Sequence, residues 1–151
     1  VSVSKQRAVI TVTPYTVTPL GILRCNGIQS TAVIWVEPTP TVYFVPVQDT
    51  ICDNDVTDIE LRSNNHPTNP IRFDYTLTYN ADSVAITNIN PGRTGYVTGG
   101  KITERLDNLG TNAQLVRFNV TPYTVDNDGD VRCVAGVPFT VDACLYPTPA
   151  G

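Results

Sequence analysis

The chain has 151 residues, of which 41% are hydrophobic and 16% are charged, and its formal net charge is −4. This balance excludes an intrinsically disordered chain, and the excess of acidic over basic residues argues against a nucleic-acid-binding protein. No uninterrupted apolar run approaches the roughly 20 residues that a transmembrane helix needs, so we expect no membrane span. Because it lacks an initiator Met, we expect the sequence to be a processed or excised piece.

Segments rich in Thr and Val follow one another along the chain and predict an all-β fold, because β-branched residues suit a pleated surface. Residues 56–62 alternate with a period of two, which is the period of a half-buried strand. Val56, Asp58, Glu60 and Arg62 fall on one side, and Thr57, Ile59 and Leu61 fall on the other. Residues 71–79 alternate in the same way. In chain order, the expected strands are 7–18, 30–37, 41–47, 56–62, 71–79, 83–88, 101–109, 115–125 and 137–146.

One stretch of sequence occurs twice. Val-Thr-Pro-Tyr-Thr-Val spans residues 12–17 and again residues 120–125, an offset of 108. Arg24-Cys25 recurs at the same offset as Arg132-Cys133, and Pro-Thr-Pro occurs at 38–40 and at 147–149, an offset of 109. A repeat of this length is the size of one antiparallel β-sandwich and is too long for a helical solenoid repeat.

The repeat predicts the domain organisation. Residues 1–37 are expected to be the C-terminal hairpin of a preceding repeat, 38–147 a complete β-sandwich module, and 148–151 the start of the next linker. An isolated two-stranded hairpin is marginal in water, and this one would expose Val9, Ile34 and Trp35, among other apolar residues. We therefore expect residues 1–37 to pack on neighbouring repeats, on copies of the same chain or on another partner.

The four cysteines are candidates for disulfide bonds: Cys25, Cys52, Cys133 and Cys144. No C-x-x-C pair is present, which argues against a zinc ribbon or a thioredoxin-like site. Structural disulfides of an exported protein are favoured over buried free thiols, and the sequence leaves the connectivity open. Pairing of Cys52 with Cys144 and pairing of Cys133 within the module are both possible.

The succession of Thr11-Val12-Thr13-Pro14, Cys25-Asn26-Gly27, Pro38-Thr39-Pro40 and Thr50-Ile51-Cys52 resembles the PKD-like, immunoglobulin-like repeats of large Bacteroidetes surface proteins. These include gliding-motility adhesins and proteins secreted by the type IX system. The second copy departs from the pattern, because Cys133-Val134-Ala135-Gly136 is one residue longer and Cys144 is additional. The resemblance implies an immunoglobulin-like sandwich in a tandem array at the cell surface. It also implies O-glycosylation at Asp-Ser/Thr-aliphatic motifs, which makes Thr50 and Ser83 candidates.

Residues Asp126, Asp128 and Asp130 form the sharpest acidic cluster and are candidate ligands for calcium, a cation that prefers oxygen donors. The equivalent loop, residues 18–23, has no acidic residue, so a polar hairpin turn is the alternative interpretation. Catalysis has little support, because the single histidine, His66, lies in a loop sequence without a placed carboxylate, and we expect no enzyme and no cofactor except possible calcium.

Two functions follow from these patterns. The first is a structural repeat of a long extracellular adhesin or filament, which extends and polymerises through strand pairing and in which Pro-Thr-Pro linkers limit bending. The alternative is an accessory module of a secreted protein that binds surface carbohydrate or calcium. Candidate aromatic residues for sugar stacking are Trp35, Tyr43, Phe44, Phe73, Tyr75 and Tyr79, for which core packing is the other explanation.

Overall fold

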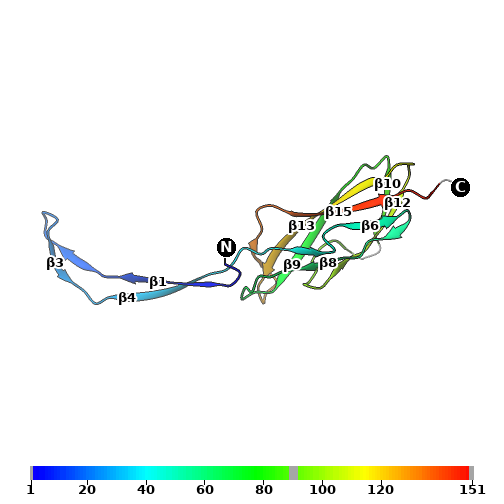
Figure 1. Cartoon of the computed structure of the whole chain (residues 1–151). Helices are drawn as coiled ribbons and strands as arrows, with labels where there is room; N and C mark the ends of the chain where they lie inside the picture. Colours follow the sequence, from blue (N-terminus) through cyan, green and yellow to red (C-terminus); the bar gives the residue numbers. More distant parts are fainter. Residues whose placement is uncertain (1, 89–91, 150–151) are drawn as a thin grey trace.

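The chain folds into a β-sandwich that carries a long N-terminal β-arm, as shown by a computed structural model that describes residues 2–88 and 92–149 (Figure 1). No helix occurs in those residues, which confirms the all-β prediction. The first residues and the C-terminal linker lie at opposite ends of the sandwich, and the arm projects from the end at which the chain starts. No helix in the described part of the chain could span a bilayer.

The first layer of the sandwich is organised around one twelve-residue strand, β13 (Gln114–Val125). One edge of β13 pairs antiparallel with β9 (Ile71–Thr78), and its other edge pairs first with β15 (Phe139–Tyr146) and then with β14 (Val131–Val134). The outer edge of β15 takes a parallel strand, β6 (Asp49–Cys52). The strand predicted at 71–79 is confirmed, whereas β6 was absent from the prediction, which placed one strand at 41–47.

The second layer consists of two small sheets. Two continuous chain segments, 55–62 and 101–108, each contribute one strand to both sheets. The first sheet has the order β10-β12-β7, and the second has the order β11-β8-β5. Their strands are β5 (Tyr43–Val45), β7 (Asp55–Val56), β8 (Ile59–Arg62), β10 (Val84–Asn88), β11 (Lys101–Ile102) and β12 (Glu104–Asn108). The strands predicted at 56–62 and 101–109 are therefore each divided in two.

Thr57 explains how the two small sheets form one layer. Its backbone N–H donates to the carbonyl of Glu104 at 3.0 Å, and its hydroxyl donates to the carbonyl of Ile102, also at 3.0 Å. The same hydroxyl accepts the N–H of Glu104 at 2.9 Å. One buried threonine thus satisfies the backbone groups that the break in pairing leaves free.

The two layers enclose one apolar core. The alternation predicted for 56–62 holds, because Ile59 and Leu61 are fully buried, and Phe73 and Tyr75 are buried from the facing layer. The rings of Tyr75 and Phe118 lie 6.0 Å apart between centroids. Burial of these alternating side chains is the main stabilising term for such a sandwich.

The arm is one long hairpin whose two sides pair in two successive antiparallel ladders. β1 (Gln6–Val12) pairs with β4 (Ser30–Val36) near the sandwich, and β2 (Tyr15–Val17) pairs with β3 (Leu23–Asn26) at the far tip. Every residue of these four strands is exposed in the structure.

Candidate functional site: the N-terminal arm

The arm repeats the last hairpin of the sandwich in the same strand register. Ala8 lies opposite Ile34 on the arm, and Val116, 108 positions after Ala8, lies opposite Ala143, 109 positions after Ile34. Further along, Tyr15 pairs with Asn26 just as Tyr123 pairs with Val134. The sequence repeat therefore corresponds to a repeated piece of tertiary structure.

The hydrogen bonds at the irregular positions are repeated as well. Gly27 donates its N–H to the carbonyl of Pro14 at 2.7 Å, and Ala135 donates to that of Pro122 at 3.0 Å. The N–H of Cys25 bonds the hydroxyl of Thr16 at 3.2 Å, and that of Cys133 bonds the hydroxyl of Thr124 at 3.1 Å. Two bonds outside the regular ladder thus recur at the same offset, which a chance likeness between two Thr/Val-rich hairpins does not explain.

The loop that holds the candidate calcium ligands has a counterpart at the tip of the arm. Asp126 accepts the N–H groups of Asp128 at 3.0 Å and Asp130 at 2.9 Å. In the arm, the hydroxyl of Thr18 accepts the N–H of Ile22 at 3.1 Å, which is the position equivalent to Asp130. The first residue of each loop therefore closes the turn by bonding backbone amides.

Asp126 is engaged on both carboxylate oxygens. Besides the two amides, it accepts a bond from Nε of Arg132 at 2.6 Å. The N–H of Asp130 and the Arg132 guanidinium hold the pKa of the Asp126 carboxyl below its usual range. Within the described ranges, no group of three acidic, histidine or cysteine side chains is arranged to hold a metal ion. The calcium prediction for Asp126, Asp128 and Asp130 gains no support from this geometry.

The two copies differ on their outer faces. In the sandwich, Arg117 and Asp142 lie opposite each other on β13 and β15, and Arg117 Nε donates to Asp142 Oδ1 at 2.7 Å. On the arm, the equivalent opposed pair is Val9 and Val33. Trp35 lies on the same face and is 53% exposed, with the Lys5 ammonium 4.8 Å from its ring centroid. The outer face of the arm therefore has an apolar pair where the sandwich has an ion pair.

The base of the arm is bonded to the sandwich. His66 donates its N–H to the carbonyl of Val3 at 2.7 Å, and Lys5 Nζ donates to the Thr68 hydroxyl at 3.2 Å. The N–H of Thr68 donates to Glu37 Oε2 at 3.0 Å. Hydrogen bonds from Thr68 lower the pKa of Glu37. These contacts fix where the arm leaves the sandwich.

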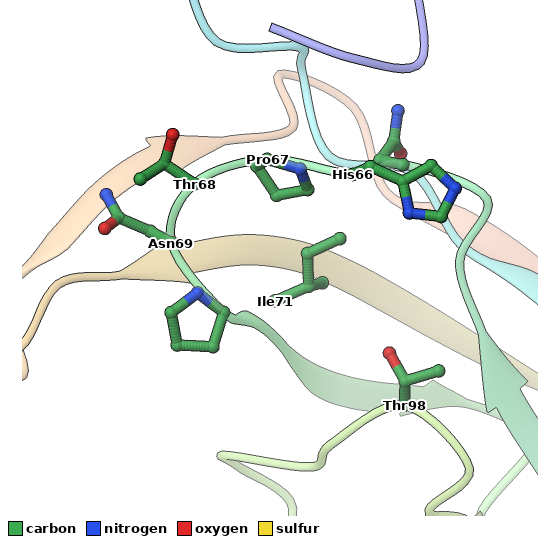
Figure 2. Close-up of a pocket in the computed structure, with 8 residues that line it drawn as sticks. His66, Pro67, Thr68, Asn69, Ile71 and Thr98 are labelled. Carbon is green, nitrogen blue, oxygen red and sulfur yellow. The ribbon is translucent and has the colours of Figure 1, made fainter.

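An open hollow of about 400 Å³ lies beside this junction and is lined by the loop that carries His66. Figure 2 shows Pro67, Thr68 and Asn69 along this loop, with Thr98 on the opposite side. Among the described residues that line this hollow, none carries a carboxylate or a thiol.

All four cysteines carry free thiols in the structure. Cys144 lies opposite Thr50, and Cys52 lies opposite Tyr146, so the two thiols are diagonal neighbours on β15 and β6. Strand geometry puts their Cα atoms about 8 Å apart, which exceeds the ~7 Å limit for a disulfide without backbone movement. The disulfide interpretation therefore has no support here, and the Cys52–Cys144 pairing is disfavoured.

The remaining candidates occupy different places. Thr50 is exposed on β6 and Ser83 is half-buried before β10, so Thr50 is the more accessible of the two glycosylation candidates. Phe73 and Tyr75 are core residues, and so the six aromatic candidates do not form one exposed row.

A buried charged cluster was missed by the sequence analysis. Glu104 is fully buried on β12, and its Oε1 accepts bonds from Nε of Arg93 at 2.7 Å and from the hydroxyl of Tyr75 at 2.8 Å. Burial, followed by the Glu104 hydrogen bond, raises the pKa of Tyr75. The available signal was that Glu104 shares the inward phase of the alternation with Leu106.

Comparison with known proteins leaves the family undetermined. No family model and no curated protein matches the chain. Among solved structures, it is similar to domains 4 and 5 of the S-layer protein SbsC, with a TM-score of 0.40 and 8% sequence identity. The match covers 78% of this chain and 59% of the SbsC chain, so this chain spans less than two thirds of the length of the SbsC chain.

Proposed function

We propose that this chain is a structural repeat of an extracellular surface protein, in which β-sandwiches follow one another in a linear array. The observation that carries the proposal is the arm, whose strand registers and irregular hydrogen bonds reproduce those of the sandwich's last hairpin. A hairpin with the geometry of a module's end, placed before a complete module, is what a tandem array contains.

The ends of the sandwich support a linear arrangement. Pro38 and Pro40 of the first Pro-Thr-Pro segment are buried, and Thr41 after them bonds Asn65 through its N–H at 2.7 Å. The equivalent Pro147 and Pro149, in the C-terminal linker, are not buried. A following module would cover this second end as the sandwich covers the first, and would do so at the far side of the molecule.

The surface location and the role as an adhesin or filament rest on the resemblance to PKD-like surface repeats. No catalytic role is proposed. The carbohydrate- or calcium-binding alternative has no observation in its favour, because the acidic loop is occupied by its own amides and the aromatic residues are divided between core, surface and arm.

Antibodies raised against the sandwich test the proposal on intact cells of the source organism. We expect them to label unpermeabilised cells, and protease treatment of intact cells to remove the signal. Labelling that appears only after permeabilisation would contradict the surface location. A glycan-binding screen with the recombinant chain is expected to give no saturable binding.

A further inference from the structure

The arm exposes the face that is the core face in its counterpart. We call this the inner face of the arm. Its apolar residues are Ala8, Ile10, Val12, Ala32, Ile34 and Val36, and the register adds polar Gln6 and Ser30 at its two ends. The equivalent sandwich residues, Val116, Phe118, Val120, Val141, Ala143 and Leu145, are all at most 2% exposed, whereas Ile10 on the arm is 45% exposed. All six positions are apolar in both copies, so the inner face has kept the chemistry of a sandwich core.

Among the described residues, no strand pairs with the outer edge of β1 or of β4, and the counterpart shows what each edge accepts. The edge of β13 turned away from β15 pairs antiparallel with β9, so the equivalent edge of β1 fits an antiparallel strand. The edge of β15 turned away from β13 pairs parallel with β6, so the equivalent edge of β4 fits a parallel strand. Arg7 is the single charged residue in β1 and β4, and exposed edge strands normally carry more charge or proline to prevent pairing.

An intact second copy does not fit these requirements. Its β9 and β6 already pair with its own β13 and β15. The apolar side of its second layer is already covered by its own β13 and β15. Two arms packed face to face would cover both inner faces but would leave the outer edges of β1 and β4 unpaired. What fits is a sandwich that has every strand except its last hairpin.

We propose that the arm is an interaction surface for such an incomplete β-sandwich, with the strands of β5–β12 and without those of β13–β15. The partner adds a β9-like strand to β1, a β6-like strand to β4 and an apolar sheet to the inner face. This inference deepens the proposed array and rests on it, because in an array the partner is the first part of the preceding module.

A lengthened chain tests the proposal. Residues 38–108 are placed directly before Val1 of the full chain, which reproduces the repeat offset because Val1 is equivalent to Leu109. Hydrogen exchange is then followed at the N–H groups of β1 and β4 that point away from the hairpin. In the 151-residue chain they face solvent, and we expect rapid exchange. In the lengthened chain we expect them to slow to the rates of the equivalent amides in β13 and β15.

Two substitutions in adjacent residues provide the matched control. Ile10→Asp in the lengthened chain puts a carboxylate at the position equivalent to fully buried Phe118, and we expect the arm to lose its protection. Val9→Asp lies at the position equivalent to Arg117 on the outer face, and we expect protection to remain. In the 151-residue chain neither change is expected to alter exchange, since both side chains are exposed.

Arm amides that exchange equally fast in both chains would overturn the proposal, as would protection that survives Ile10→Asp. Sedimentation of the 151-residue chain covers the other occupants. We expect a monomer, and a dimer that Ile10→Asp dissociates would show that a second copy fills the inner face instead. Cell labelling reports on location and exchange reports on completion of the arm, so either proposal can fail without the other.

Discussion

The hydroxyl of Tyr75 donates a hydrogen bond to Oε1 of Glu104 across the interior of the sandwich, at 2.8 Å. Tyr75 comes from β9 in the first layer and Glu104 from β12 in the second, so the bond joins the two sheets. The same oxygen receives Nε of Arg93, which reaches in from the surface with its side chain 37% exposed. Both donors bond Oε1, whereas Oε2 of Glu104 is buried without a hydrogen-bond partner among the described residues.

Removing Arg93 should destabilise the sandwich more than removing an exposed arginine. Arg93→Ala leaves the carboxylate of Glu104 buried without its cation, and such losses cost about 3–5 kcal/mol of unfolding free energy. Arg117→Ala, which breaks the exposed pair with Asp142, should cost about 1 kcal/mol or less. Urea unfolding of both variants measures the difference, and equal midpoints would show that the buried pair has no special role.

Tyr75→Phe should have an intermediate effect, because it removes one hydrogen bond to a buried charge and keeps the ring in the core. We expect a loss of about 1.5–3 kcal/mol in unfolding free energy. The contacts of the ring with Phe118 and Tyr96 should persist, which a near-ultraviolet circular dichroism spectrum can check. A variant as stable as the parent would show that the bond adds nothing net.

Gly129 should resist substitution more than Gly136. Gly129 has a φ of +86° in the loop of Asp126, where a side chain is strained although no atom lies within 4 Å of an added Cβ. Gly21, at the equivalent position of the arm, has a φ of +77°. We expect Gly129→Ala to cost about 1–2 kcal/mol and Gly136→Ala, which has equal space and no such φ, to cost less. Thermal unfolding of the two variants gives the comparison.

Calcium should leave the thermal midpoint unchanged. The carboxylate of Asp126 already bonds two loop amides and Arg132, so binding a cation would require these bonds to break. Calorimetry in millimolar calcium and in chelator is the measurement. A rise in the midpoint that Asp128→Asn and Asp130→Asn abolish would restore the calcium-site interpretation.

Acidification should weaken the fold partly through Asp142. The bond from Arg117 holds the pKa of Asp142 below its usual range, so the unfolded state binds the proton more tightly. The resulting stabilisation is complete above the unfolded pKa of about 4 and is lost as the pH falls through the lower folded value. Asp142→Asn should therefore flatten the dependence of unfolding free energy on pH in this window, by about 1 kcal/mol or less. An unchanged slope would contradict the assignment.

The outcome at particular residues shows what a linear pattern can predict. Ile59 and Leu61 are buried as their alternation indicates, because an extended backbone places every second side chain on one face whichever strand lies beside it. The division of 56–62 into β7 and β8 was not predictable, since it depends on Thr57 bonding Ile102 and Glu104, some 45 residues away. The parallel strand β6 was missed for the same reason, because its place beside β15 is a long-range pairing.

The amino-acid order alone determined that the chain is all-β, that alternate residues point inward and that one hairpin occurs twice, because these properties depend only on neighbours along the backbone. Tertiary structure decided which strands pair, that Glu104 is buried against Arg93 and Tyr75, that the cysteines stay apart, and that the arm stands in solvent. Those outcomes depend on groups distant in sequence meeting in space, and on the absence, around the arm, of the strands that cover its counterpart.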